Sequence, residues 1–355
     1  MRREIILAHR EKEKQRLLVL LLLILLLVAG CLIFTSLGVI KLPPWEIARI
    51  ILTSITSNGS TPAGIDEIHR AIILDIRLPR ILAAVLVGAG LATAGAVFQG
   101  LLMNPLADPY TLGISTGAAF GATLAMFFGV FLPGGLGLLT VPLLAFAGAL
   151  LALGAVYGLA VVNGTMAVTN LILSGVIVSA ILSAAISFLK SLAGEGVGSI
   201  VFWLMGSFAS RGWHHVFLCL PVVLAGLVIC CYYADDLNIL SLGSKSARQL
   251  GVDDSKVITI LLVTSSLVTA ACVSISGIIG FVGLIVPHLM RMLVGPDHRF
   301  LIPVSALGGA LLLVGADTIA RNLLAAEIPV GVLTTLLGGP FFCYIFRIKA
   351  KRQIF

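Results

Sequence analysis

A long stretch without charge is the feature that most constrains what this chain can fold into. From Pro109 to Leu189 the sequence contains no Asp, Glu, Lys or Arg. Soluble domains have about 25% charged residues, whereas this chain has 11% and is 59% hydrophobic. Three further charge-free segments, 81–107, 212–234 and 257–290, each exceed the roughly 20 residues that cross a bilayer. The chain is therefore predicted to be an all-α, polytopic membrane protein.

The apolar runs must be helical, because backbone amides in lipid can only be satisfied within their own segment. Pro, Gly and polar clusters divide these runs into about ten transmembrane helices. The predicted spans are 17–37, 80–103, 111–132, 140–162, 168–190, 213–233, 257–277, 280–294, 302–320 and 330–347. The first run is longer than the apolar core of a signal peptide and precedes further spans, so it is interpreted as a transmembrane helix.

The basic residues predict the orientation, because cytoplasmic connections carry an excess of Lys and Arg. With ten spans and a cytoplasmic N-terminus, 15 of the 23 basic residues lie inside and 8 lie outside. Both termini are thus expected in the cytoplasm of a cell-membrane protein. The predicted organisation is a cytoplasmic segment 1–16, one transmembrane domain 17–347 and a cytoplasmic tail 348–355.

Motifs for catalysis and for metal binding are missing from the sequence. It contains no Gly-Lys dipeptide and hence no phosphate-binding loop of the G-x4-G-K-[ST] type. The six cysteines lie in apolar segments without paired histidines, and we expect no metal site and no cofactor. Only Asp317 falls clearly inside a span, four residues before Arg321, a spacing that suits an ion pair. This gives little support to ion coupling, which usually needs carboxylates within the membrane.

One polar stretch in the second half predicts a cytoplasmic pair of short helices at about 235–251. Asp235 and Asp236 suit the positive end of a first helix, and Gly243 ends it. Ser244 is expected to cap the second helix, and Gly251 to close it. Periodicity alone leaves open whether this is an ordinary amphipathic loop or a docking element.

Several ordered motifs resemble the FecCD-type permeases, which are membrane subunits of ATP-driven importers for iron-siderophores, haem and cobalamin. The similarity runs from about residue 17 to 347. The motifs are RLPR at 77–80, GAVFQ at 95–99, NPLADP at 104–109, LGIS at 112–115, LSLG at 240–243, ARQLG at 247–251, GFVGL at 280–284, PH at 287–288, IPVG at 328–331 and GGP at 338–340.

This resemblance implies the type II ABC importer architecture, a homodimer, two cytoplasmic ATPase subunits and an extracytoplasmic solute-binding protein. Arg77, Arg80 and Arg321 match family arginines that dock the binding protein, and the alternative is that they anchor helix ends to lipid headgroups. The polar loop 163–165 matches the family's cytoplasmic gate region. The positions that match the ATPase contact are Leu240, Ser241, Leu242, Gly243, Ala247, Arg248, Gln249, Leu250 and Gly251.

The expected function is import of a metal chelate, with a ferric siderophore preferred over cobalamin and haem because siderophores are the commonest cargo in the family. Ser179, Ser183 and Ser187 share one helix face and are candidates to line the pathway, although tight helix packing explains that face equally well. The chain is not expected to be an enzyme or to bind nucleic acid, and its surroundings are membrane lipid. An ion-coupled secondary transporter and an intramembrane enzyme are the alternatives from other classes.

Overall fold

The computed structural model describes residues 2–38, 40, 42–56, 66–133, 137–162, 165–166, 168–323 and 327–352. These residues are almost entirely helical, and the described strands are the two-residue β1 (Val161–Val162) and β2 (Thr165–Met166). Residues 163 and 164 of the predicted gate loop lie outside the described part of the chain.

Among the residues that the structure describes, ten apolar helices correspond to the ten predicted spans, of which seven are long enough to cross a membrane and three are shorter. In chain order they are α1 (Arg2–Ser36), α4 (Leu78–Leu101), α5 (Ile114–Phe127), α6 (Thr140–Ala160), α7 (Val168–Leu192), α9 (Trp213–Tyr232), α12 (Asp254–Ser276), α13 (Val282–Val294), α14 (His298–Asn322) and α15 (Val330–Arg352). The all-α, multi-span prediction is confirmed.

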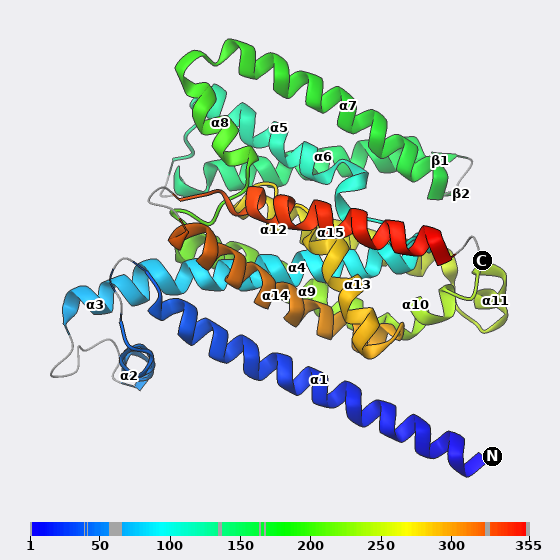
Figure 1. Cartoon of the computed structure of the whole chain (residues 1–355). Coiled ribbons are helices and arrows are strands. Elements are labelled where there is room, and N and C mark those ends of the chain that lie inside the picture. The colour runs from blue at the N-terminus through cyan, green and yellow to red at the C-terminus, as the bar shows by residue number, and fades with distance from the viewer. Residues whose placement is uncertain are drawn as a thin grey trace.

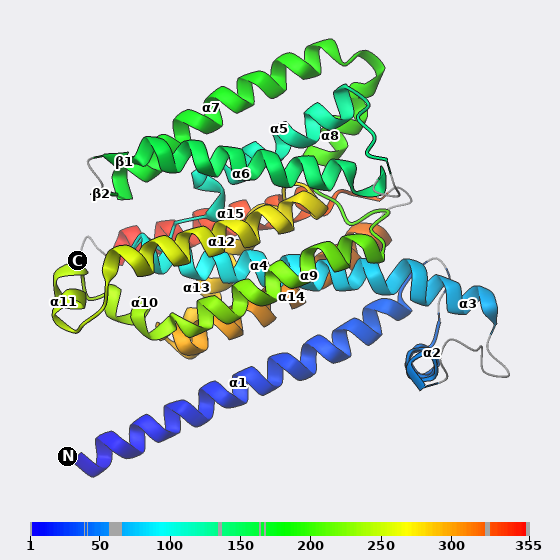
Figure 2. The same ribbon diagram turned by 180° about the vertical axis from the view of Figure 1, so that it is seen from behind.

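The central helix of the bundle is α4, which is buried along nearly its whole length. It lies between α14 and α13 on one side and α12 and α9 on the other (Figures 1 and 2). A Cβ atom on Gly88 would collide with the backbone of Gly309 in α14, and one on Gly95 would collide with the backbone of Gly283 in α13. Small residues let helices approach closely where lipid supplies no hydrophobic drive to pack, so these glycines set the spacing of the core.

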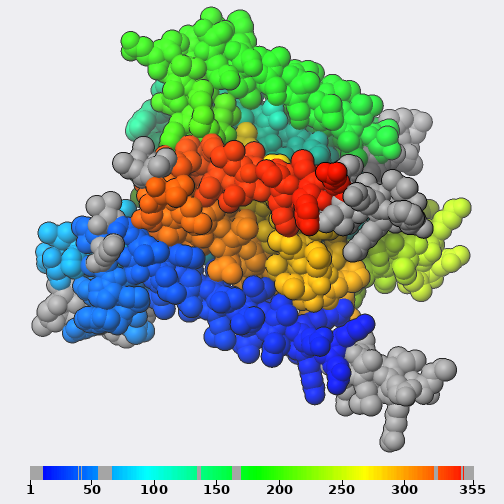
Figure 3. All heavy atoms as spheres, viewed as in Figure 1, coloured from blue at the N-terminus to red at the C-terminus, as the bar shows by residue number. Residues whose placement is uncertain are grey.

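The two edges of the bundle are formed by α1 and α7, which lie on opposite sides of the core (Figure 1). Helix α7 packs mainly on α5 and α6, whereas α1 packs mainly on α14. The space-filling view shows α15 between α7 and the pair formed by α13 and α14 (Figure 3).

The two ends of the bundle carry different short helices. Both termini lie at one end together with α10 (Ala234–Leu240) and α11 (Ser244–Gln249) (Figures 1 and 2). The opposite end carries α2 (Pro44–Thr56), α3 (Glu67–Ala71), the π-helical turn η1 (Ile72–Arg77) and α8 (Val197–Leu204). The count of basic residues predicted that both termini and the α10–α11 pair lie on the same side, and they do lie at one end of the bundle.

Several helix limits differ from the sequence prediction. Helix α5 is 14 residues long and is preceded by a 3-10 turn, η2 (Pro109–Leu112). The left-handed Gly113 (φ 75°) separates this turn from α5 and so interrupts the predicted span 111–132. The expected terminal segments continue the helices, since α1 begins at Arg2 and α15 extends to Arg352. Helices α2 and α8 are additional to the predicted spans.

Candidate coupling, docking and pathway sites

The polar stretch near residue 240 forms two short helices joined by a tight turn, as predicted. Gly243 has φ 98° and Gly251 has φ 84°, and such positive values favour glycine. Helix α11 begins at Ser244 itself, with Gly243 in the N-cap position and no side-chain cap. The expectation that Ser244 caps this helix is therefore wrong, because the turn already places its backbone in the helix.

The two helices bury one set of apolar residues and expose another. Leu240 and Ala247 are buried against the bundle, whereas Leu242 is 67% exposed and Leu250 is 62% exposed. An apolar side chain at a polar helix end has no lipid to cover it, so this pair is a candidate contact for a protein partner. Ser241, Arg248 and Gln249 also match the family's ATPase contact, and they are exposed on the same two helices and their turn.

Helix α11 is held to the start of α12 by a two-pronged ion pair. Arg248 donates from Nε and Nη2 to the two carboxylate oxygens of Asp254, both at 2.9 Å. Bidentate Arg–carboxylate pairs fix relative orientation better than a single contact. Arg248 matches the family's ATPase contact, and within this chain it also joins α11 to α12.

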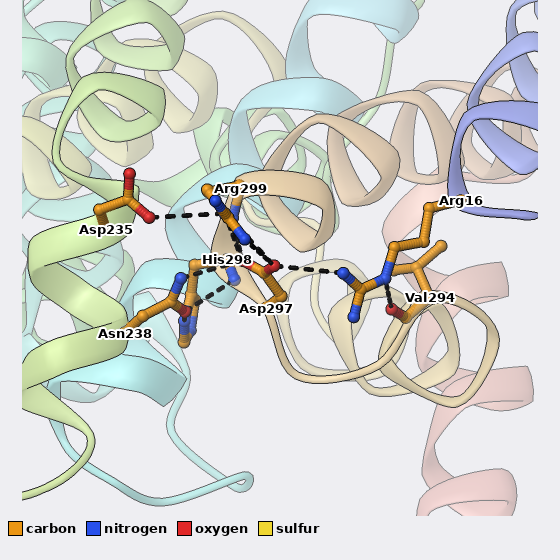
Figure 4. Close-up of polar contacts among 7 residues, drawn as sticks. All are labelled: Arg16, Asp235, Asn238, Val294, Asp297, His298 and Arg299. Carbon is orange, nitrogen blue, oxygen red and sulfur yellow. Dashed lines mark hydrogen bonds and ion pairs between the residues drawn. The ribbon is translucent and has the colours of Figure 1, made fainter. Parts of the chain in front are cut away.

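Helix α10 is tied to the first turn of α14 through Asn238 (Figure 4). Its Nδ2 donates to Asp297 Oδ1 at 2.9 Å, and its Oδ1 accepts from the backbone N and the Nδ1 of His298 at 2.9 and 2.8 Å. His298 is buried. The amide of Asn238 thus joins α10 to α14, which packs extensively against α4.

Asp297 also contacts two arginine side chains at this point (Figure 4). Arg16 of α1 donates from Nη1 to Asp297 Oδ2 at 3.2 Å and from Nε to the carbonyl of Val294 at 2.8 Å. Arg299 donates from Nη2 to the same carboxylate at 2.9 Å. Burial alone would raise the pKa of Asp297, but hydrogen bonds from Arg299 and Asn238 outweigh it and lower the pKa to about 2. The carboxylate is therefore a stable anionic link between α1, α10 and α14.

The sequence analysis did not single out Asn238, Asp297 or His298. Asp297 follows Gly295 and Pro296 and precedes an apolar run, which is the pattern of a helix N-cap. Its side chain does accept from the N–H of Arg299. The partner Asn238 is 59 residues away, and no local pattern connects the two.

We expect Asn238→Ala to destabilise the protein by about 1.5–3 kcal/mol, since it removes a hydrogen bond to a charged group and two more to His298. Thermal unfolding of the purified protein in detergent measures this change. The matched control is Asp235→Ala, because Asp235 is 71% exposed and meets Arg299 only at 3.4 Å. A surface pair contributes about 0–1 kcal/mol, so equal losses for both variants would contradict the anchoring role of Asn238.

At the opposite end, Arg80 forms ion pairs with two acidic residues. It donates from Nε and Nη2 to Asp317 of α14 at 2.9–3.2 Å, and from Nη1 to Glu327 at 3.1 Å. The predicted pairing of Asp317 with Arg321 is wrong, because α4 packs against α14 and brings Arg80 to the carboxylate instead.

Arg77 and Arg321 both bind backbone carbonyls near the end of α1. Arg77 donates to the carbonyls of Thr35 and Ile40 at 2.8 and 2.6 Å, and Arg321 donates to that of Phe34 at 2.6 Å. Arg77 is buried, and Arg321 is partly buried. The three arginines matched to binding-protein docking thus gather at one end, and their guanidinium groups already have partners within the chain.

The three serines that are candidates to line a pathway, Ser179, Ser183 and Ser187, are all on α7 (Val168–Leu192). Ser183 and Ser187 are exposed, and Ser179 is half-buried against the turn at Gly113. Apolar side chains exposed on the same helix are Leu173, Val176, Ile177, Ile181, Phe188 and Leu192. From Thr169 to Leu189 this helix has no charged residue.

The sequence model of the FecCD transport family matches residues 21–348. The chain belongs to the FecCD transport family. Members of this family are permease subunits of ABC importers, and ATP hydrolysis resides in their partner subunits.

Curated FecCD relatives and a solved structure cover most of this chain. The cobalamin import system permease BtuC of Halobacterium salinarum is 47% identical over 82% of this chain and 77% of its own length. The hemin transport system permease HmuU of Yersinia pestis is 42% identical over 79% and 84%. A structure described as an inward-facing conformation of a metal-chelate type ABC transporter is 37% identical, with a TM-score of 0.80 over 93% and 98%. The predicted family and fold are confirmed.

Proposed function

We propose that two copies of this chain form the membrane pathway of an ATP-driven importer that carries a metal chelate into the cytoplasm, with cobalamin as the first candidate cargo. The observation that carries the proposal is the exposed pair Leu242 and Leu250, which lies at the same end as both termini. Charge bias puts that end in the cytoplasm, where an ATPase subunit can cover the pair.

Helix α7 supports the paired arrangement. It lies at an edge of the bundle and exposes both apolar residues and the hydroxyls of Ser183 and Ser187. A second copy facing this edge would enclose a surface of mixed apolar and hydroxyl character. Such a surface suits a bulky chelate, whose metal charge is already neutralised by its own ligands, better than a bare ion.

The relatives change the order of the candidate cargoes. The sequence analysis preferred a ferric siderophore, whereas the relative at 47% identity is a cobalamin permease and the one at 42% is a hemin permease. A large ring-shaped chelate is common to both. Cobalamin is therefore tested first, and a ferric siderophore is kept in the same assay.

The test is uptake by proteoliposomes that contain this chain with its ATPase and binding-protein partners. Cyanocobalamin, haemin and a ferric hydroxamate are supplied one at a time with ATP inside. We expect cobalamin uptake that requires both ATP hydrolysis and the binding protein, and an ATPase variant unable to hydrolyse ATP is the control. Uptake of only the hydroxamate would overturn the cargo assignment. Uptake driven by an ion gradient without the ATPase would overturn the importer mechanism.

A further inference from the structure

A cavity of about 670 Å³, lined by both polar and apolar side chains, lies beside α8, at the end of the bundle opposite α10 and α11. Its walls come from α8, from the connection between α8 and α9, and from the ends of α5 and α12. The cavity lining includes Trp203, Ser199, Ser210 and Arg211. The sequence analysis assigned no role to any of them.

The cavity lining supplies hydrogen-bond donors and no acid. The lining residues include four serines and Arg211, and none of them is Asp or Glu. Trp203 is only 7% exposed, and its Nε1–H has no hydrogen-bond partner within the described chain. The buried Nε–H of Arg211 is also without one among the described residues. Buried donors of this kind are normally satisfied, and leaving one unpaired costs about 1–3 kcal/mol.

The charge of Arg211 points to the ligand class. Its closest side-chain contact is His215, whose Nε2 lies 3.4 Å from Nη1, and no carboxylate contact is found for it in the part of the chain that the structure describes. Burial lowers the pKa of Arg211 to about 10. Arg211 is half-buried, and a cation that is partly desolvated without a counterion is unfavourable. An anion in the cavity would compensate this charge.

The walls of the cavity are fixed by the backbone. The N–H of Ser207 donates to the carbonyl of Ser276 at 2.7 Å, and that of Gly331 donates to the carbonyl of Gly206 at 3.2 Å. These bonds tie the α8–α9 connection to the end of α12 and the start of α15. The backbone of this wall is therefore held in place before a ligand arrives, which reduces the entropic cost of binding.

We propose that this cavity is an outer subsite that receives a carboxylate or phosphate group of the incoming chelate, held by Arg211 and the indole N–H of Trp203. The inference rests on the proposed function, which makes this end of the bundle the outer one. Met126 and Phe202 add apolar wall beside the donors. An acidic group carried on an apolar body, as in many metal chelates, matches this combination.

Binding is tested with the purified full chain in maltoside micelles, which contain no phosphate. Citrate, inorganic phosphate and a short-chain phosphatidylglycerol are the probes, and tryptophan fluorescence is the readout. We expect citrate or phosphate to give a saturable change that is lost in Arg211→Gln and in Trp203→Phe. Arg49→Gln is the matched control, because Arg49 is an exposed arginine at the same end. A response to phosphatidylglycerol alone would identify a lipid headgroup site and overturn the proposal, as would an unchanged response in Arg211→Gln.

Transport separates this inference from the proposed function. For cobalamin, which carries a phosphate, we expect Arg211→Gln to raise KM about tenfold or more, as loss of a charged hydrogen bond predicts. Cobinamide, which lacks that phosphate, should have the same KM in both proteins. Failure of the wild-type chain to import any chelate would refute the proposed function. The citrate experiment would still show whether the cavity binds an anion. An unchanged KM for cobalamin in Arg211→Gln would refute the subsite alone.

Discussion

Leu250→Asp is expected to reduce uptake by more than about tenfold while the assembled complex continues to hydrolyse ATP. Leu250 is 62% exposed and directly precedes the left-handed Gly251, so its side chain can change without disturbing the bundle. Its neighbour Ala247 carries the packing against the protein core. A charge at this position would be desolvated in an apolar interface and left unpaired.

The expected size follows from interface energetics. Central apolar contacts typically contribute about 2 kcal/mol or more, so uptake should fall by more than about tenfold. Uptake and phosphate release are measured on the same proteoliposomes, and their ratio reports the coupling. Ser255→Asp is the matched control, because it places the same charge on an exposed position in the first turn of α12. Normal uptake by Leu250→Asp would exclude α10–α11 as the site of the ATPase contact.

Arg80→Gln is expected to destabilise the protein by about 3–5 kcal/mol, the usual cost of removing one partner from a buried ion pair. Asp317 is only 2% exposed and Arg80 is 13% exposed, so the remaining carboxylate would stay buried without its main counterion. Glu327 is 46% exposed and would gain solvent instead. Thermal unfolding in detergent measures the loss of stability.

The double variant Arg80→Gln with Asp317→Asn should recover most of that stability, because two neutral amides can hydrogen-bond to each other. This variant also tests the docking role of Arg80 without the complication of misfolding. If Arg80 meets an acidic residue of the binding protein, the stable double variant should bind that protein more weakly, and most clearly at low salt, where exposed charges are least screened. Equal affinity would leave Arg80 with a structural role only.

The ten membrane helices could be predicted from the sequence because each depends on a local property. A run of apolar residues must form a helix in lipid wherever its neighbours lie. The same local reasoning found the two short helices near residue 240, where acidic residues and glycines mark the ends. It was less accurate for α5, since η2 and the left-handed turn at Gly113 replace the start of the span expected at 111–132.

Contacts between distant segments could not be predicted in this way. Spacing along one helix favoured a pair between Asp317 and Arg321, whereas the packing of α4 on α14 placed Arg80 there. Asn238 shows the same limit, because nothing near it in the sequence indicates that its amide reaches Asp297 and His298. The donors around Arg211 likewise come from α8, the α8–α9 connection and α12, which only the fold brings together.

The sequence by itself therefore determined the class of protein, the number of spans and the position of the α10–α11 pair, because hydrophobicity and helix-ending residues act over a few neighbouring positions. The tertiary structure decided which charges meet, how α10 is anchored and where the outer cavity lies. Those features depend on which helices are side by side, and that choice is made by close packing at sites such as Gly88 against Gly309.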